Sequence, residues 1–480
     1  MLDRQPGCAF TMPDSPRVAL VSLGCAKNLV DSEKMLGLLA EAGCAVTADE
    51  ADADVIVINT CGFLEASRTE AHQVIREAIA RKRDGTLKRV VVAGCLVQRD
   101  QGDILKCIDG VDALVGVNNR DDVVRAVLGN GAQMPKSISL PVASGGQAVD
   151  GVHRTTDVYL SDYHPFTQID TARLRLTPRH YAYLRISEGC DQKCTFCTIP
   201  SIRGPMHGKP PRAVLEEARE LVSDGVVEIN LIGQDTTSYG LGADRFDVGL
   251  AGLLRQLNAV DGLEWIRLMY VYPSVLTDEM LDAIADCERV CKYIDIPLQH
   301  IHDRVLKAMY RRIDRSGTER LLQRIRDRID GVAIRTTMIV GFPGETDQEF
   351  EELVRFIREF RFDALGAFVY SQEANTPAGR MNNQIPDAVK QQRLHELMTA
   401  QQEVAFALSD ERVGAELEVL VEKRAKPNEV VARHRGQAPM VDSVTYVHDC
   451  DASPGDFVTV RCVGRNGYDL IAQPTRVEPG

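Results

Sequence analysis

The chain has 480 residues, more than one ordinary domain holds, and this length indicates about three domains. Its 69 acidic and 56 basic side chains give a formal net charge of −13, which argues against coating nucleic acid through the overall field, although a local basic patch would survive that average. No run of roughly 20 apolar residues occurs, and the start has neither an apolar signal core nor an Arg-rich pattern. We expect a cytoplasmic protein with no membrane partner.

Residues 17–128 alternate apolar strand-like runs with helical stretches. The runs RVALVSLG, DVIVIN and RVVVAG alternate with amphipathic segments such as SEKMLGLLAEAG and EAHQVIREAIARK. This βαβ rhythm predicts an amino-terminal α/β domain with a parallel sheet. Residues 129–178 lose the periodicity and are rich in Gly, Ser, Pro and Thr, so they are predicted to form a linker with some ordered pieces.

A second alternation occupies residues 179–405. Its strand-like runs are YAYLRIS, VVEINLIG, EWIRLMY, KYIDIPL, VAIRTTMIV and ALGAFVYS. Six strand–helix units in succession favour a partial (β/α)6 barrel over a short open sheet. From 411 to 476, short strands alternate with polar turns, which predicts a small all-β barrel. The sequence therefore predicts a multidomain α/β protein with a C-terminal β-barrel.

The cysteines point to metal. Thirteen is an odd number, spread over a long chain without an export signal, so a disulfide framework is not expected. The segment EGCDQKCTFCTIPSIRG places Cys190, Cys194 and Cys197, here called the barrel triad, directly after a predicted strand. Three thiolates in one loop can hold three corners of a 4Fe-4S cluster and leave the fourth iron open to a small molecule. Structural zinc would need a fourth ligand, and His207 lies ten residues on, beyond a Pro.

Three further cysteines each follow an apolar strand directly. These are Cys25, Cys61 and Cys95, here called the amino-terminal triad. Because parallel strands point the same way, their carboxyl ends bring the three thiols to one edge of the sheet, where α/β proteins bind ligands. We therefore predict a second cluster there. Cys8, Cys44, Cys107, Cys287, Cys291, Cys450 and Cys462 lack such an arrangement, and the Cys287–Cys291 pair is predicted to be core or surface thiols.

The C-x3-C-x2-C loop at the end of a first barrel strand, with Phe196 before its third cysteine, resembles the signature of radical S-adenosylmethionine (SAM) enzymes. The resemblance implies that the open iron binds the amino and carboxylate groups of SAM, and that reductive cleavage gives a 5′-deoxyadenosyl radical. Such a radical serves an unactivated C–H bond, for which no side chain is a strong enough base.

Two further segments end predicted barrel strands and are candidate SAM contacts. Gly233, Gln234 and Asp235 end the second strand, and Gly341, in MIVGFPGET, ends the fifth and resembles the family's glycine segment beside the adenosine. Both lie at the carboxyl edge of the barrel, where barrel sites form. Both segments also match ordinary turns with no role in SAM binding. The segment Gly233 to Asp235 matches a turn with a helix N-cap, and GFPGE matches a strand–helix turn.

The order of the three domains resembles the methylthiotransferases over about residues 17–475. The resemblance implies that the amino-terminal triad holds an auxiliary 4Fe-4S cluster, that the barrel triad holds the radical cluster, and that the C-terminal barrel is TRAM-like and recognises the substrate. One SAM then methylates a sulfur at the auxiliary cluster, and a second supplies the radical that removes hydrogen from the substrate carbon.

Two substrate classes are open: the β-carbon of an aspartate in the twelfth protein of the small ribosomal subunit, and a tRNA adenosine. SLGCAKNLVDSE, TPRHYAYLRISEGCDQKCTFC and DIPLQHIHDRVLKAMYR resemble the ribosomal-protein type, with Leu298, Gln299 and His300 where the tRNA type has Val-Gln-Ser. Residues 411–480 carry 11 acidic and 9 basic side chains, a net charge of −2, whereas a module that grips tRNA should be basic. A ribosomal protein or ribosome is thus the favoured partner.

A non-catalytic iron–sulfur regulator is the alternative from another class. It accounts for the six clustered cysteines but leaves the barrel without a purpose. We assign no chemical role to His300 and His302, and we expect Arg311 and Arg312 to form a solvated helix face. The sequence identifies neither the reductase nor the sulfur donor.

Overall fold

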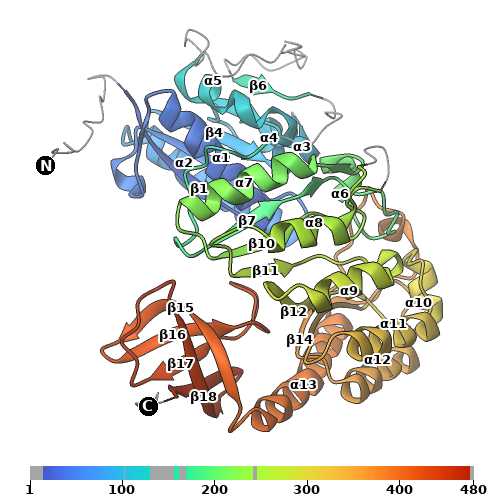
Figure 1. Ribbon diagram of the computed structural model, residues 1–480. Coiled ribbons are helices and arrows are strands. Elements are labelled where there is room, and N and C mark those ends of the chain that lie inside the picture. Colours follow the sequence, from blue (N-terminus) through green and yellow to red (C-terminus); the bar gives the residue numbers. More distant parts are fainter. Residues whose placement is uncertain (1–14, 102, 130–155, 162–168, 242–245, 476–480) are drawn as a thin grey trace, which may run out of the picture. The chain divides into compact units, whose positions relative to one another are not determined.

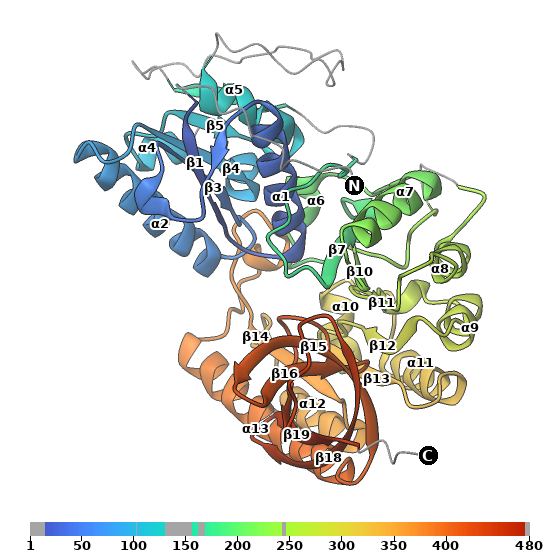
Figure 2. The ribbon, with the colours of Figure 1, turned by 60° about the vertical axis from the view of Figure 1, so that its left-hand side comes forward.

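A computed structural model describes residues 15–101, 103–129, 156–161, 169–241 and 246–475 of the chain. It divides into two compact units (Figures 1 and 2). The first comprises residues up to 165 with 170–176 and 201–204, and the second comprises 166–169, 177–200 and everything from 205 onward. Each unit is described by itself below. Among the described residues, none of the helices combines the length and apolar character that crossing a membrane demands.

The first unit is a parallel sheet of six strands in the order β2-β1-β3-β4-β5-β6. Its strands are β1 (Arg17–Ser22), β2 (Ala45–Val46), β3 (Val55–Thr60), β4 (Arg89–Gly94), β5 (Ala113–Val115) and β6 (Asp157–Tyr159). Its helices are α1 (Ala26–Glu41), α2 (Glu65–Arg83), α3 (Cys95–Asp100), α4 (Asp103–Cys107) and α5 (Val123–Leu128), with 3-10 turns η1 (Glu50–Asp52) and η2 (Val117–Asp122).

Helices cover both faces of this sheet, which is why β3, VIVINT, is buried at every position. Ile56 and Ile58 pack in one apolar cluster, whereas Val55 and Val57 pack in the cluster on the opposite face. Strand β6 lies within the stretch predicted to be a linker and pairs with β5. The rest of that stretch up to residue 168, namely 130–155 and 162–168, is largely outside the described residues.

The second unit begins with six parallel strands that pair in chain order. They are β7 (Tyr181–Arg185), β10 (Glu228–Ile232), β11 (Trp265–Leu268), β12 (Val290–Asp295), β13 (Ala333–Val340) and β14 (Ala364–Val369). The short strands β8 (Ser187–Glu188) and β9 (His207–Gly208) pair separately. This sheet is the predicted partial (β/α)6 barrel, here called the central barrel.

Helices follow the strands in the alternation predicted from the sequence, and Figure 2 shows α7, α8, α9 and α11 along one side of the sheet. The helices and 3-10 turns are α7 (Pro211–Ser223), α8 (Leu250–Asn258), η3 (Pro273–Val275), α9 (Asp278–Asp286), α10 (Asp303–Ala308), α11 (Arg315–Arg328), α12 (Asp347–Phe360), η4 (Ala378–Arg380) and α13 (Asp387–Glu411). The short helix α6 (Ile199–Arg203) begins in this unit, and its residues from 201 onward belong to the first unit. The connections at the carboxyl ends of the strands therefore form one edge, where barrel enzymes place their sites.

The chain ends in a closed five-stranded barrel, also part of the second unit. Its strands are β15 (Glu416–Lys426), β16 (Glu429–His434), β17 (Thr445–His448), β18 (Phe457–Asn466) and β19 (Asp469–Pro474). Alternate inward side chains, including Val419, Val421 and Val430, fill its interior. The predicted C-terminal β-barrel is thus confirmed.

A seam of aromatic and charged side chains joins the C-terminal barrel to the central barrel. Trp265 at the start of β11 is fully buried, with its ring 5.1 Å from that of Phe457. The carboxylate of Glu228, also fully buried, accepts hydrogen bonds from Arg267 of the central barrel and Arg433 of β16. Burial favours the neutral acid, but Arg433 and Arg267 outweigh it and hold the pKa of Glu228 below its usual value.

Candidate cluster sites

The structure brings the amino-terminal triad together at the carboxyl edge of the first sheet. Cys25 is the N-cap of α1 after β1, Cys61 follows β3, and Cys95 begins α3 after β4. The three strands are neighbours in the sheet and run parallel. Burial raises the pKa of the Cys95 thiol to about 12, and the charges of Cys25 and Cys61 act in the same direction, so the three groups interact. The predicted meeting of strand ends is therefore observed.

Glycines beside the cysteines allow this close approach. A Cβ on Gly24, whose φ is 92°, would lie 2.8 Å from the Cβ of Cys61. A Cβ on Gly62 would lie 2.8 Å from the carbonyl oxygen of Cys95. Both distances are shorter than real side chains tolerate, so larger residues would push the strand ends apart. The sequence signal was present, since each cysteine of this triad has a glycine neighbour.

A buried arginine that the sequence analysis missed contacts this triad. The Nε and Nη2 atoms of Arg203, whose exposed fraction is 2%, each lie 3.3 Å from the Sγ of Cys95. Nη2 also donates to the side-chain oxygen of Asn28 at 2.7 Å and to Asp31 at 3.0 Å. The amide nitrogen of Asn28 donates to the carbonyl oxygen of Thr60 at 2.9 Å, which fixes the orientation of the Asn28 side chain.

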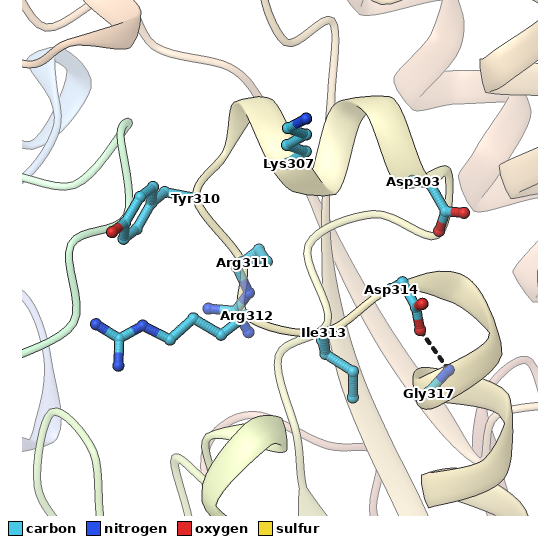
Figure 3. Close-up of a pocket in the computed structure, with 8 residues that line it drawn as sticks. All are labelled: Asp303, Lys307, Tyr310, Arg311, Arg312, Ile313, Asp314 and Gly317. Carbon is cyan, nitrogen blue, oxygen red and sulfur yellow. Dashed lines mark hydrogen bonds between the residues drawn. The ribbon is translucent and has the colours of Figure 1, made fainter.

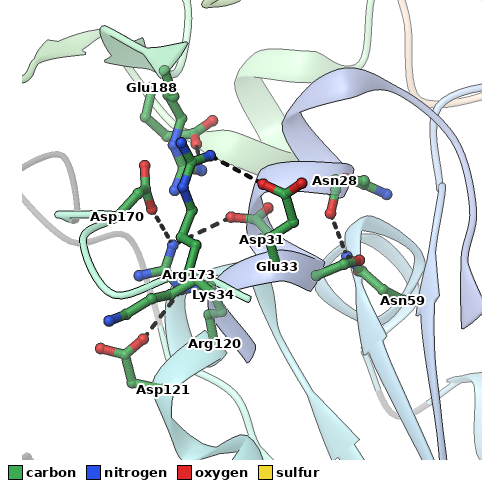
Figure 4. Close-up of polar contacts among 12 residues, drawn as sticks. Asn28, Asp31, Glu33, Lys34, Asn59, Arg120, Asp121, Asp170, Arg173 and Glu188 are labelled. Atoms are coloured by element: carbon green, nitrogen blue, oxygen red, sulfur yellow. Dashed lines mark hydrogen bonds and ion pairs between the residues drawn. The ribbon is translucent and has the colours of Figure 1, made fainter. Parts of the chain in front are cut away.

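Figure 4 shows the polar groups of α1 that surround this arrangement, including Asn28, Asp31 and Glu33. The Asn59 amide donates to the backbone oxygen of Asn28 at 2.8 Å. Arg120 lies 2.6 Å from Asp170 and 3.5 Å from Asp31. The side chains that orient Arg203 are thus themselves held by a buried network, which limits their movement.

The barrel triad lies in the loop after β7 and β8. Burial raises the pKa of the Cys190 thiol and of the Cys197 thiol to about 12, and the charge of Cys194 acts on both in the same direction. The backbone N–H of Ile199 donates to the Sγ of Cys197 at 3.4 Å. Thr195 fastens the loop to the end of α10, because its N–H and hydroxyl donate to the carbonyl oxygens of Met309 and Ala308.

Arg311 corrects one of the sequence expectations. Its exposed fraction is 8%, its Nη1 lies 3.6 Å from the Sγ of Cys194, and its guanidinium lies 4.3 Å from the ring centre of Tyr272. The expected solvated helix face was wrong for this residue, because α10 ends at Ala308 and Tyr310 takes a left-handed φ of 58° that turns the next side chain inward. Arg312 is exposed, but it lies in the loop between α10 and α11 and not on a helix face.

Figure 3 shows Arg311 and Arg312 together on the wall of an open pocket of about 670 Å³. Asp303 and Lys307 of α10 line the same pocket. Asp303 accepts a hydrogen bond from the backbone N–H of Arg315 at 2.6 Å. The pocket therefore adjoins the loop of the barrel triad through Arg311.

The end of β10 is tied to the loop of the barrel triad. Asp235, fully buried, accepts from the Nε2 of Gln192 at 2.9 Å and from the hydroxyl of Thr237 at 2.7 Å. Gln234 donates to Glu188 at 2.6 Å, and a Cβ on Gly233 would lie 2.4 Å from the hydroxyl of Ser187. These predicted SAM contacts thus lie beside the cysteine loop. Their contact with SAM stays a prediction.

Gly341, the other predicted SAM contact, ends β13. Its N–H donates to the carboxylate of Glu345 at 3.0 Å, and a Cβ there would lie 2.4 Å from the Cγ of Lys390. The position is therefore shaped by local packing, and a role beside the adenosine also stays a prediction. His300 is fully buried and its Nδ1 accepts from the N–H of His302, and burial lowers its pKa to about 3.

Each triad combines thiols with N–H donors to sulfur, the environment that cluster thiolates require. Among the described residues, no three His, Cys, Asp or Glu side chains are arranged to hold a single metal ion. The binding of a cluster by each triad stays a prediction. Of the other cysteines, Cys44, Cys287, Cys291, Cys450 and Cys462 are buried free thiols. Cys8 and the side chain of Cys107 lie outside the described residues.

Three family matches follow the domain order. Residues 17–116 match the uncharacterized protein family UPF0004, residues 184–357 match the radical SAM superfamily, and residues 413–474 match the TRAM domain. The fold and the two triads thus define a radical SAM enzyme with an amino-terminal UPF0004 domain and a C-terminal TRAM domain. The predicted fold class is confirmed.

Curated relatives narrow the class. The protein from Anaeromyxobacter sp. (strain K) named ribosomal protein uS12 methylthiotransferase RimO is 43% identical over 465 residues, which cover 96% of this chain and 94% of that protein. The protein of the same name from Geotalea uraniireducens is 40% identical, covering 95% of this chain and 98% of the relative. The chain belongs to the family of ribosomal protein uS12 methylthiotransferases, RimO. Membership confirms the predicted cofactors, SAM and 4Fe-4S clusters.

A solved structure agrees on the fold alone. The radical SAM methyltransferase TsrM from Kitasatospora setae, solved with tryptophan substrate and a SAM analogue, superimposes with a TM-score of 0.54. It is 14% identical, and the match covers 89% of this chain and 80% of TsrM.

Proposed function

We propose that the enzyme adds a methylthio group to the β-carbon of an aspartate in ribosomal protein uS12. The observation that carries the proposal is full-length identity of about 40% with relatives named for this activity, in a chain that has both cysteine triads. The C-terminal module supports a protein substrate, because its net charge of −2 offers no excess of cations to a phosphate backbone.

In this proposal each triad holds one 4Fe-4S cluster. Cys25, Cys61 and Cys95 bind the auxiliary cluster, and Cys190, Cys194 and Cys197 bind the radical cluster. When bound, the clusters and SAM supply the sulfur, the methyl group and the radical that the reaction needs.

The protein's own part is to hold these groups in position. Gly24 and Gly62 let the first three strand ends meet, Thr195 fastens the radical loop, and Asp235 ties that loop to the end of β10. Gly233, Gln234, Asp235 and Gly341 are the proposed SAM contacts. The proposed location is cytoplasmic.

The substrate is tested with anaerobically reconstituted enzyme, dithionite and SAM. Purified uS12 and bulk tRNA are incubated separately, and mass spectrometry then looks for the replacement of one hydrogen by SCH3. We expect the mass change on an aspartate-containing peptide of uS12 and none on tRNA. Modification of tRNA alone would replace the proposed substrate with a nucleoside.

The non-catalytic regulator is tested in the same samples. An enzyme releases 5′-deoxyadenosine from SAM after reduction, whereas a sensor that only holds clusters does not. A chain with Cys190, Cys194 and Cys197 all changed to Ala is the matched control, since it keeps the amino-terminal triad. Absence of 5′-deoxyadenosine from fully loaded wild-type protein would favour the sensor.

A further inference from the structure

One thiol of each triad contacts a buried arginine. Arg203 lies against Cys95 in the first unit, and Arg311 lies against Cys194 in the second. Neither pairing is local, since 108 residues separate the first pair and 117 the second. Two separate folds have therefore placed the same type of group beside one sulfur of each triad.

Arg311 has no carboxylate partner among the residues that the structure describes. Its Nε is buried, and no described residue accepts a hydrogen bond from it. Its other contacts are the carbonyl oxygen of Pro297, which accepts from Nη2 at 2.6 Å, and the face of Tyr272. An uncompensated buried cation is costly, whereas a thiolate of a bound cluster beside Nη1 would supply the missing negative charge.

Arg203 differs from Arg311 because it has a carboxylate partner. Asp31 already balances its charge, and Asn28 fixes one edge of the guanidinium. Its Nε and Nη2 face the Sγ of Cys95 as a two-pronged donor. This geometry suits a sulfur that carries negative charge, because N–H donors from a guanidinium bind anions more strongly than neutral acceptors.

We propose that Arg203 and Arg311 are positioning residues that each donate to one cluster thiolate, Cys95 and Cys194 respectively, and set the reduction potential of that cluster. The inference rests on the cluster assignments of the proposed function. Reduction adds an electron to a cluster that is already anionic, so a nearby cation and N–H donors to sulfur stabilise the reduced form and raise its potential. Loss of either arginine should make its own cluster harder to reduce.

The test uses the full-length chain, reconstituted anaerobically, in two backgrounds. Changing the amino-terminal triad to Ala leaves only the barrel-triad cluster, and changing the barrel triad to Ala leaves only the other. Arg203→Met, Arg203→Lys, Arg311→Met and Arg311→Lys are introduced into the background that retains the relevant cluster. Arg312→Met is the matched control, because Arg312 is the exposed neighbour of Arg311. The reduced cluster's electron paramagnetic resonance signal is followed during a potentiometric titration.

We expect Arg311→Met to lower the reduction potential of the barrel-triad cluster by about 59 mV or more. For one electron, this shift corresponds to a tenfold change in the reduction equilibrium constant. Arg203→Met should do the same to the auxiliary cluster. The lysine variants keep the positive charge but lose the planar set of N–H donors, so they should change the potential less than the Met variants. Arg312→Met should change the potential of neither cluster. Unchanged potentials in both Met variants, or an equal shift in Arg312→Met, would overturn the inference.

Iron content and circular dichroism show whether a variant that lacks a cluster signal is folded and whether it has lost its cluster. If a Met variant folds but loses its cluster while the Lys variant and Arg312→Met retain theirs, the arginine positions the thiolate, which supports the inference. Loss in all three would contradict it. A wild-type chain that binds only one cluster would refute the proposed function itself, whereas two clusters with unmoved potentials would refute the role of the arginines alone.

Discussion

Glu228 links the two barrels at their seam. Its carboxylate is fully buried between Arg267 and Arg433, with the Nε of Arg267 at 3.0 Å. We expect Glu228→Gln to destabilise the chain by about 3–5 kcal/mol, because it leaves the buried guanidinium of Arg267 without a counter-charge, whereas Arg433 keeps its ion pair with Glu422. Urea denaturation followed by circular dichroism measures the effect.

An exposed pair of the same C-terminal barrel is the control for this variant. Glu416 and Arg461 lie 3.0 Å apart with more than half of each side chain exposed. Glu416→Gln should cost no more than about 1 kcal/mol, because water screens an exposed pair. Equal losses in the two variants would show that the burial of Glu228 is not what matters.

His300 gives the stability a pH dependence. Burial lowers its folded pKa to about 3, whereas an unfolded histidine titrates near 6.5. Between pH 6.5 and pH 3, His300 binds a proton in the unfolded chain but not in the folded chain. The free energy of unfolding is therefore unaffected by His300 above pH 6.5, and it decreases by about 1.4 kcal/mol for each pH unit below that value. His300→Gln should remove this part of the slope in urea denaturation at pH 7.0 and 5.5. Parallel slopes would contradict the assignment.

At the scale of elements, β10 is expected to support the loop of the barrel triad. Asp235→Ala would leave the donors of Gln192 and Thr237 unsatisfied, a cost of about 1–3 kcal/mol. We expect lower iron content at the barrel triad together with a lower melting temperature, measured in the background without the amino-terminal triad. If SAM binding weakened while iron content and stability stayed at wild-type values, Asp235 would act as a direct cofactor contact instead.

The strands and the two triads were predictable because their signals are periodic or local. Apolar runs define β1, β3 and β4, and parallel pairing then carries Cys25, Cys61 and Cys95 to one edge. The arginines were not predictable, because Arg203 meets Asn28 across 175 positions of the chain. No sequence pattern announces the left-handed Tyr310 that turns Arg311 inward. GFPGE shows the opposite case, because its local pattern is the same for a strand–helix turn and for a SAM contact.

At the scale of the whole molecule, the central barrel is not expected to survive without its C-terminal partner. A chain that ends at Glu411 would expose Trp265 and remove Arg433 from Glu228. We expect an aggregating product with little cooperative unfolding, because the lost barrel covers both an aromatic surface and a buried charge. Size-exclusion chromatography and thermal denaturation measure this. A monomeric truncated chain that melts cooperatively would show that the seam is dispensable.

The aromatic contact at the seam also gives the enzyme an optical reporter of its own. Trp265 is the chain's single tryptophan, and it is buried against Phe457 of the opposite barrel. Indole emission shifts to longer wavelength when water reaches the ring, so fluorescence from unlabelled protein reports on the environment of Trp265 at the seam, where Phe457 and Arg435 contact the ring. A ligand or ribosomal partner that separates the C-terminal barrel from the central barrel would therefore cause a red shift in the emission of Trp265.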